Sequence, residues 1–491
     1  MPKAKIFYHD IGDYLSREEK LHIIAQAGDI FSLPLIQLTP NEHGDWINQR
    51  NDMFATFPPI EPKKKFVTDS KSWFNTYAIG VATNRDAWVY GFSKEKVGNN
   101  MKSMIDFYNQ QRKKLNNHEI DELSSDTTKI SWTVNLKKDA EKNTPLNIDK
   151  TQFITSCYRP FCKCELYYHK PFIERPGLWN QLFPTPEHPN LVISMKGIGD
   201  KDFSCLICYC IPDLQVNFNG QCFPLYYYTK NESTAAAPEF NFDGEQQQDE
   251  YIRHDAITDF ILKEAQNLYG KKVNKQDIFF YVYGFLHSPE YREAFAADLK
   301  KMLPRIPLME KAEAFWAFSK AGKALAALHL GYESAELYEE VEIVDNNGQP
   351  VNLQTGNDSQ QQMGDDTEIP MAAESSAALD LYHEYAMFHV EKMRFPNKND
   401  KSTIIYNNRL TIKNIPAEAY DYVVNGKSAI EWIMERYAIT TDRASGIKND
   451  PNAWSREHED PKYIFNLLLS VITVSIETMK IVKELPKVKF E

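Results

Sequence analysis

The stretch "FITSCYRPFCKCELYYH", residues 153–169, alternates apolar and polar side chains and is rich in aromatic residues. Alternation with a period of two places successive side chains on opposite faces of a strand. The stretch "SCLICYCIPDLQVNF", residues 204–218, has the same character. These patterns predict that the chain is mainly β up to about residue 228.

The period of the apolar residues changes after residue 250. Apolar residues then lie three and four positions apart, at Ile257, Phe260, Ile261, Ala265 and Leu268. This spacing predicts a helix, and Gly270 is the residue type that ends one. The polar run "NESTAAAPEFNFDGEQQQDE", residues 231–250, separates the two parts and is expected to be a linker.

Three more helices are predicted after Gly270. Asn274 is a suitable N-cap for the first, and Ser288 followed by Pro289 begins a second that stops at Pro304. A third covers "AEAFWAFSKAGKALAALHLG", residues 312–331.

Two helix starts are also predicted near the C-terminus. Ser428 and Glu431 have the spacing of a capping box, and Asp460 followed by Pro461 begins a last long helix. Strands and helices together predict an α+β fold with several lobes.

The composition indicates a large soluble protein of 491 residues with 42% hydrophobic side chains. The most apolar run begins at Ile464 and is interrupted by Asn466 and Ser470, so we expect a buried helix and no membrane partner. The N-terminus lacks the apolar core of a secretory signal. We therefore expect a cytoplasmic location and reduced cysteines.

The net charge of -12 is unevenly distributed. Residues 331–384 contain 13 acidic and no Lys or Arg residues, so the rest of the chain sums to about +1. Residues 62–114 contain 11 Lys or Arg against 4 acidic residues. Such a basic stripe fits a nucleic-acid surface, and it equally fits a solvated lysine-rich surface.

Signatures of catalysis are weak. Gly426, Lys427 and Ser428 resemble the end of a phosphate-binding loop, but Asp421 stands where that loop has its first glycine. His383 and His389 are six residues apart, not the four that place two zinc ligands on one helical face. The sequence also lacks a dinucleotide fingerprint, a methyltransferase tetrapeptide and a helicase box.

The cysteines raise the question of a zinc site. Cys162, Cys164, Cys205, Cys208 and Cys210 are close in sequence, but they lie in strand-like runs and not on glycine-containing knuckles. Buried apolar thiols are the preferred interpretation, so we expect no metal.

Seven blocks, in this order, resemble the C-terminal specificity region of type ISP restriction-modification enzymes. They are "KIFYHDIGDYLSREEKL", "NEHGDWINQRNDMF", "WFNTYAIGVATNRDAWVYGFS", "CYRPF", "IPDLQVNF", "DIFFYVYGFLHSPEYREAFAADLKKMLPRIPL" and "YDYVVNGKSAIEWIMERYAITTDRASGIKNDPN". The sixth block is also similar to type IIG recognition domains. Where related domains have an acid and a base after "YRPF", this chain has Cys162 and Cys164.

The resemblance implies a module that recognises double-stranded DNA and directs an upstream adenine methyltransferase and helicase-nuclease. S-adenosylmethionine, ATP and Mg²⁺ would then belong to those upstream parts, and this chain would have no cofactor or catalytic activity of its own. The expected division is a methyltransferase remnant and linker (1–62), a β-rich recognition subdomain (63–230), a linker (231–250), a helical subdomain (251–335), an acidic insert (336–384) and a C-terminal subdomain of strands and helices (385–491).

The stretch "TNRDAWVY", residues 83–90, is the candidate for contacting bases. Arg pairs with guanine, Asn with adenine, and Asp accepts from cytosine, so Asn84, Arg85 and Asp86 could recognise a sequence. Equally, Asp86 could pair with Arg85, and Asn84 could form a turn with its own backbone.

Basic residues in the stripe, in the "YRPF" region and in the tail are candidates for phosphate or cleft contacts. They are Lys63, Lys64, Lys65, Lys94, Lys96, Lys102, Arg159, Lys163, Arg175, Lys427, Arg436, Arg443 and Lys448. The alternatives are a divergent methyltransferase or nuclease, and a protein-interaction scaffold for a motor subunit.

Overall fold

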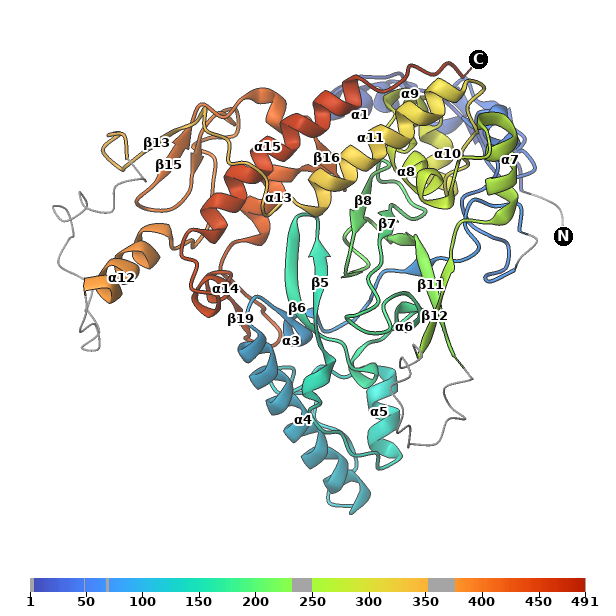
Figure 1. Ribbon diagram of the computed structural model, residues 1–491. Coiled ribbons are helices and arrows are strands. Elements are labelled where there is room, and N and C mark those ends of the chain that lie inside the picture. The colour runs from blue at the N-terminus through green and yellow to red at the C-terminus, as the bar shows by residue number, and fades with distance from the viewer. Residues whose placement is uncertain (1–3, 48, 68–69, 232–249, 352–375, 491) are drawn as a thin grey trace.

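The computed structural model describes residues 4–47, 49–67, 70–231, 250–351 and 376–490 (Figure 1). Helices and small, mainly antiparallel sheets alternate along these residues, which confirms the predicted α+β class. Short 3₁₀ helices lie at Ile30–Ser32, Lys150–Gln152, Lys170–Phe172 and Ala417–Tyr420.

The N-terminal segment is held by local contacts. Its elements are β1 (Ile6–Tyr8), α1 (Arg17–Ala27), β2 (Ile36–Leu38) and α2 (Asp52–Thr56). β1 pairs with β2 in antiparallel register, and Ser16 and Glu19 form a capping box at the start of α1. No residue of α1 is buried. Hydrogen bonds along the backbone therefore define this helix, without a core beneath it.

The first four-stranded sheet contains most of the alternating stretch of residues 153–169. Its strands are β4 (Tyr90–Gly91), β5 (Phe153–Arg159), β6 (Cys162–Tyr167) and β9 (Ile211–Pro212), in the order β4-β6-β5-β9. β5 and β6 form an antiparallel hairpin, and Phe161 has a positive φ of 56° in its turn. The prediction of strands across residues 153–169 is confirmed.

The second four-stranded sheet lies between the two apolar cores of the described residues. Its strands are β3 (Ala78–Ile79), β7 (Val192–Met195), β8 (Cys205–Cys208) and β10 (Gln221–Pro224), in the order β3-β10-β7-β8. Val192 faces one core and Ile193 the other, and Cys222 and Phe223 divide in the same way. Alternate side chains are thus buried on both faces.

A long helix interrupts the region predicted to be mainly β. The helices here are α3 (Asp86–Val89), α4 (Lys94–Asn116), α5 (Val134–Glu141) and α6 (Trp179–Leu182). α4 and α5 form the projection at the bottom of Figure 1. α4 buries Val97, Met101, Met104, Ile105 and Tyr108, whose helical spacing was present in the sequence. Its many polar residues masked that signal.

The ribbon of β11 (Tyr226–Lys230) and β12 (Tyr251–Asp255) follows the second sheet. The two strands pair antiparallel over their full length. Most of the predicted linker, residues 232–249, lies outside the described residues.

The helical part begins after the ribbon. It contains α7 (Asp259–Tyr269), α8 (Lys275–Phe285), α9 (Pro289–Ala294), α10 (Ala296–Lys301) and α11 (Ala312–Leu330). The predicted caps at Gly270, Asn274 and Ser288 are confirmed. The single helix predicted from Ser288 to Pro304 is wrong, because the chain bends at Phe295. The Phe295 ring packs 5.1 Å from that of Phe54.

α8 and α11 cross at two glycines. A Cβ on Gly322 would lie 1.9 Å from the carbonyl oxygen of Phe280, and one on Gly284 would lie 2.1 Å from that of Phe318. The backbones are therefore in direct contact at this crossing, and only glycine fits there.

The C-terminal part mixes short strands and helices. Its elements are β13 (Glu342–Val344), α12 (Ser376–Phe388), β14 (Ile404–Ile405), β15 (Thr411–Lys413), β16 (Val423–Val424), β17 (Lys427–Ser428), α13 (Ala429–Arg436), β18 (Thr440–Thr441), β19 (Lys448–Asn449), α14 (Asn452–Glu457) and α15 (Tyr463–Lys483). The capping box of Ser428 and Glu431 is confirmed. Residues 352–375 of the predicted acidic insert lie outside the described residues.

α15 runs beside α11 across the top of the molecule in Figure 1. It begins at Tyr463, two residues after the predicted Pro461. By length and composition it could cross a membrane, but 67% of its apolar stretch is buried inside the molecule. It is therefore a core helix, as its sequence predicted.

Candidate nucleic-acid interface

The loop of residues 83–86, which joins β3 to α3, exposes one of its three candidate side chains. Asn84 is exposed and has a positive φ of 54°. Thr83 Oγ1 accepts a hydrogen bond from the Arg85 amide at 3.2 Å and donates one to the Asp86 carboxylate. These bonds close the turn from inside, so Asn84 is left at its tip.

Arg85 points into the protein. It is only 4% exposed, and its Nη2 donates to Thr133 Oγ1 at 2.9 Å. The guanidinium lies 5.7 Å from the Phe172 ring, and its Nε and Nη1 have no hydrogen-bond partner. Burial lowers the pKa of Arg85 to about 10. In this conformation the side chain supports the loop from beneath, and a base contact by Arg85 would require it to swing outward.

Asp86 is held by the "YRPF" strand. Arg159 donates through Nη2 to Asp86 at 3.3 Å and through Nη1 to Asp213 at 2.7 Å. Its guanidinium stacks 3.9 Å from the Tyr158 ring, and the Tyr158 hydroxyl lies 3.3 Å from Asp86. Burial raises the pKa of Asp213 to about 7, against the opposing charge of Arg159. Arg159 thus connects the two carboxylates that fix the loop.

Two clefts adjoin this loop. Cleft A, of about 440 Å³, is lined by residues 81–88, Thr127, Ser131, residues 213–215, Asp442, Ala444 and Ser445. Cleft B, of about 260 Å³, is lined by residues 86–100 in part, Tyr158, Cys162, Cys164, Arg436 and residues 440–450 in part. Both contain Asp86, Ala87 and Asp442, so they meet at the loop.

The β18–β19 hairpin forms the wall opposite the loop. Its turn is closed by the Asp442 amide, which donates to the Ile447 carbonyl at 2.9 Å, and by the Ser445 amide, which donates to Asp442 Oδ1 at 2.8 Å. Thr127 Oγ1 donates to the Ala444 carbonyl at 2.7 Å. This bond anchors the hairpin to the segment between α4 and α5.

Cations and anions at the clefts differ in how they are paired. Asp86 is bound by Arg159, and Asp450 is bound by Arg456 at 2.8 Å. By contrast, Lys96 and Lys448, which line cleft B, and Arg443, which lies in the β18–β19 turn and lines neither cleft, are exposed, and the described part of the chain offers them no ion-pair partner. Cationic side chains are therefore available on both walls, whereas these carboxylates are already occupied.

Three other candidates, Arg436, Lys427 and Arg175, are either paired with a carboxylate or lie outside the clefts. Arg436 lines cleft B and pairs with Glu435, which also binds Lys427. The Arg175 amide donates to the Ala82 carbonyl at 3.1 Å beside cleft A, and its side chain is exposed.

The remaining lysines lie elsewhere. Lys163 pairs with Glu333 and donates to the Tyr209 hydroxyl at 2.7 Å. Lys94 and Lys102 are exposed on α4. Lys63, Lys64 and Lys65 are exposed, none of them lines either cleft, and Lys65 Nζ lies 4.0 Å from the Tyr77 ring.

Several polar residues at the clefts were missed from the sequence. Thr127 and Ser131 come from the connection after α4, and Gln215 comes from the "IPDLQVNF" block. Asn100, Thr440 and Thr441 line cleft B. Gln215 could have been found, because its block is one of those that carry the family resemblance, whereas Thr127 and Ser131 have no such signal.

The residues behind the phosphate-loop and zinc alternatives have different surroundings from those that such sites require. Gly426 has a φ of 82° in the hairpin between β16 and β17, a different setting from a strand-to-helix phosphate loop. All seven cysteines are free thiols. Within the described ranges, no group of three or more His, Cys, Asp or Glu side chains is placed to hold a metal ion.

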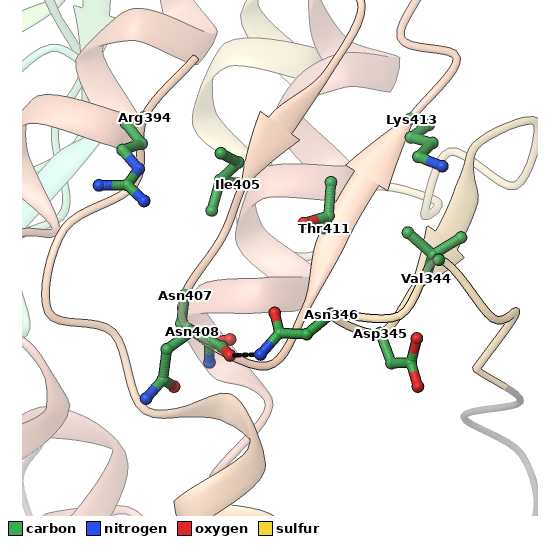
Figure 2. Close-up of a pocket in the computed structure, with 10 residues that line it drawn as sticks. Val344, Asp345, Asn346, Arg394, Ile405, Asn407, Asn408, Thr411 and Lys413 are labelled. Atoms are coloured by element: carbon green, nitrogen blue, oxygen red, sulfur yellow. Dashed lines mark hydrogen bonds between the residues drawn. The ribbon is translucent and has the colours of Figure 1, made fainter. Parts of the chain in front are cut away.

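A larger cavity of about 490 Å³ lies on the β13–β15–β14 sheet and shares no residue with the clefts. Figure 2 shows Arg394, Lys413 and Asn407 around it. The side-chain amide of Asn346 donates a hydrogen bond to the backbone carbonyl of Asn408. Arg394 and Lys413 come from different sides of the cavity and do not converge on one point.

Residues 72–467 match the family model described as the type ISP C-terminal specificity domain. No curated protein matches.

Solved structures of longer proteins are similar over almost the whole chain. A nuclease-deletion mutant of the type ISP restriction-modification enzyme LlaGI, in complex with a DNA substrate mimic, has 34% identity and a TM-score of 0.77 over 99% of this chain and 39% of its own. The ATP-dependent type ISP enzyme LlaBIII, bound to DNA, has 34% identity and a TM-score of 0.78 over 100% of this chain and 28% of its own.

A complex of DrdV with DNA has 26% identity and a TM-score of 0.76, over 99% of this chain and 44% of that one. The chain thus spans less than half the length of each of these proteins. The family match covers most of the chain and confirms the resemblance seen in the seven sequence blocks. The chain belongs to the type ISP C-terminal specificity domain family.

Proposed function

We propose that this chain is the sequence-specific double-stranded DNA recognition module of a type ISP restriction-modification enzyme. The observation that carries the proposal is the pairing pattern at cleft B: Lys96 and Lys448, which line it, and Arg443, in the turn of the adjoining β18–β19 hairpin, have no ion-pair partner among the described residues. Unpaired cations on two facing walls suit a polyanion that enters between them. The similar enzymes LlaGI, LlaBIII and DrdV, solved with DNA, support this.

The proposal gives the exposed side chains different roles. Asn84 stands at the tip of a loop that is fixed from inside by Thr83 and Asp86. A carboxamide in that position can form the two hydrogen bonds that identify adenine in the major groove. Lys96 and Lys448 lie on opposite walls of cleft B and would neutralise phosphates, which position the duplex.

Arg85 and Arg159 act beneath this surface in the proposal. Arg85 reaches Thr133, and Arg159 connects Asp86 with Asp213. Both therefore hold the loop that carries Asn84. Lys63, Lys64, Lys65, Lys94 and Arg175 are further candidates for phosphate contacts outside the clefts.

Methylation, translocation and cleavage would be carried out by other parts of the enzyme, which would bind S-adenosylmethionine, ATP and Mg²⁺. An exposed apolar face supports a contact with such a part. Large apolar side chains on residues 4–47 are exposed, at Phe7, Tyr14, Leu21, Ile24, Ile30, Phe31, Ile36, Trp46 and Ile47. Exposed apolar side chains in this number are typical of a segment that another surface covers. We place this assembly in the cytoplasm.

The proposal is tested by selecting a target duplex from random DNA with the full chain. Asn84→Ala should cost about 1 to 3 kcal/mol of binding free energy on the target and leave binding to a scrambled duplex nearly unchanged. Lys448→Ala should weaken binding to both duplexes and lower the slope of log affinity against log salt by about 1.

The matched control is Lys271→Ala, because Lys271 is an exposed lysine that lines neither cleft. It should leave both affinities and the salt slope unchanged. Selection that yields no preferred sequence, or an equal loss on both duplexes for Asn84→Ala, would contradict the assignment of this loop to base recognition.

A further inference from the structure

Two cysteines from different strands have their sulfur atoms in contact behind the recognition loop. Cys157 lies on β5, and Cys210 immediately precedes β9. Their Sγ atoms are 3.3 Å apart. β5 and β9 pair in parallel, with Ser156 opposite Ile211, which puts Cys157 and Cys210 on the same face of the sheet. Both are free thiols in this structure.

The separation is close to what a disulfide requires. An S–S bond is about 2.05 Å long, so the two sulfurs need to approach by about 1.2 Å. Adjacent strands already hold the two residues, and small movements of both side chains can supply that approach. Both residues are half-buried and therefore partly exposed to solvent, so small reagents have access.

The surroundings make Cys157 the reactive partner. Hydrogen bonds from the Cys208 and Cys210 thiols lower the pKa of Cys157 well below its usual value. Lys163, directly opposite Cys157 in the β5–β6 ladder, adds a positive charge in the same direction. The thiolate is the nucleophilic form of cysteine, and its fraction rises as the pKa falls. The pKa of Cys210 is raised, by its bond to Cys157 and by burial, so it remains a thiol.

The other cysteines lack this combination. Burial raises the pKa of Cys205 to about 11 and that of Cys222 to about 12. Both are essentially inaccessible, with 1% and 0% exposure. Thiols in such surroundings are inert structural residues.

We propose that Cys157 and Cys210 are a redox pair that forms a reversible disulfide when the folded protein meets a peroxide. Disulfides in a reducing compartment are usually transient and respond to oxidants, which suits a half-buried pair of this kind.

The chemistry balances with hydrogen peroxide as the oxidant. The Cys157 thiolate attacks one peroxide oxygen, the O–O bond breaks, and the leaving hydroxide takes up a proton to become water. Cys157 is then a sulfenic acid. The Cys210 sulfur attacks the Cys157 sulfur, the S–O bond breaks, and the departing hydroxide leaves as water with the Cys210 proton. Two thiols are oxidised by two electrons, and one peroxide is reduced to two waters.

The bond would form at the scaffold of the loop. The Cys157 carbonyl accepts from the Asp213 amide at 2.9 Å, and the next two residues of β5 are Tyr158 and Arg159, which contact Asp86. The oxidised state would thus covalently join β9 to β5, the strand whose Tyr158 and Arg159 contact the Asp86 carboxylate.

The test uses the full chain, reduced and freed of reductant, and treated with one equivalent of hydrogen peroxide. We expect the number of titratable thiols in the denatured protein to fall from seven to five and to return to seven with dithiothreitol. Fragmentation of the linked peptides by mass spectrometry should place the bond between Cys157 and Cys210.

Substitutions distinguish the pair from general oxidation. Cys157→Ser should leave the remaining six thiols reduced, and Cys210→Ser should stop at a Cys157 sulfenic acid that dimedone traps. Cys222→Ser, the buried control, should still lose two thiols. Retention of all seven thiols in the wild-type chain, or a bond that maps to Cys208, would overturn the proposal. So would the loss of two thiols from both Cys157→Ser and Cys210→Ser.

Discussion

The helix pair α8–α11 and the N-terminal segment of residues 4–47 differ in whether their apolar side chains are buried. In α8 every residue from Asp277 to Phe285 is buried, and α11 packs on it at backbone contact. In the N-terminal segment α1 has no buried residue, and Phe31 is 91% exposed. The first region has a complete interior, whereas the second has an apolar face without a cover.

This difference separates two sources of stability. Burial of the α8–α11 contact is complete within the chain, so its free energy is available to the isolated protein. The exposed apolar side chains of residues 4–47 contribute no burial free energy until another surface removes them from water. Substitutions should therefore have large effects in the first region, and in the second region only when a partner is present.

The largest effect is expected for Gly322→Ala. The added Cβ would lie 1.9 Å from the Phe280 carbonyl and 2.8 Å from the Gly284 amide, which are backbone atoms that cannot rotate away. We expect a loss of about 3 kcal/mol in the free energy of unfolding, at the upper end of overpacking costs. Urea denaturation followed by circular dichroism measures it.

Gly98→Ala on α4 is the matched control, because a Cβ there would meet only the Phe153 ring edge at an ordinary 3.6 Å. Alanine favours a helix over glycine, so this variant should be unchanged or slightly more stable. If Gly322→Ala behaved like Gly98→Ala, the two helices would not cross at backbone contact.

An intermediate effect is expected from acid, through histidines buried beside α8. Both ring nitrogens of His329 form hydrogen bonds. Nδ1 lies 2.6 Å from the Tyr283 hydroxyl oxygen, and Nε2 lies 2.9 Å from Thr478 Oγ1. Burial lowers the pKa of His329 to about 3, and that of His287 well below its usual value, with the Arg292 charge acting in the same direction. The folded protein therefore keeps both rings neutral.

The unfolded chain binds these protons near pH 6.5, so the stability that depends on the neutral rings is complete above pH 6.5 and lost as the pH falls towards 3. We expect His329→Gln to make the fall in unfolding free energy between pH 6.5 and 5 shallower by about 1.4 kcal/mol per pH unit. His22→Gln, on exposed α1, should not alter the profile. Parallel profiles for wild type and His329→Gln would show that His329 takes up its proton over the same pH range in the folded and the unfolded protein.

The smallest effect is expected for Phe31→Ser in the isolated chain. An exposed side chain with no cover contributes little, so the free energy of unfolding should change by less than about 0.5 kcal/mol. Binding of a hydrophobic dye should decrease, because the apolar face is interrupted. Phe54→Ser, at a residue 1% exposed, should instead lower stability by about 3 kcal/mol or more. A similar loss for both would mean that residues 4–47 already have a cover.

The sequence predicted elements with strong local signals. The N-cap at Asn274 was found from its residue type, and the capping box at Ser428 was found because Glu431 lies three positions after it. The strands of residues 153–169 were found from their alternation. α4 was missed, since its apolar residues are diluted by lysines and asparagines. The bend at Phe295 was missed because the sequence there has no local break signal, and the Phe295 ring packs on Phe54, which is distant in the sequence.

The candidate site was predictable in its parts and not in its geometry. The basic stripe and the tail residues were named, and the structure places Lys96, Arg436 and Lys448 around one cleft. Whether Arg85 points outward depends on Thr133, 48 residues away, which no local pattern reveals. For the same reason Arg159 was a DNA candidate from sequence, yet the structure shows it bound to two carboxylates.

The hydrogen bond from Thr127 to Ala444 bears on how a new target preference could arise. It joins the connection after α4 to the β18–β19 hairpin, so the walls around Asn84 are built from four stretches far apart in the sequence. If one of these stretches were replaced by the corresponding stretch of a related protein, it would contact cleft residues that evolved beside a different sequence. Engineering or natural recombination should therefore succeed when residues 83–86, 124–131, 213–215 and 440–449 are inherited together.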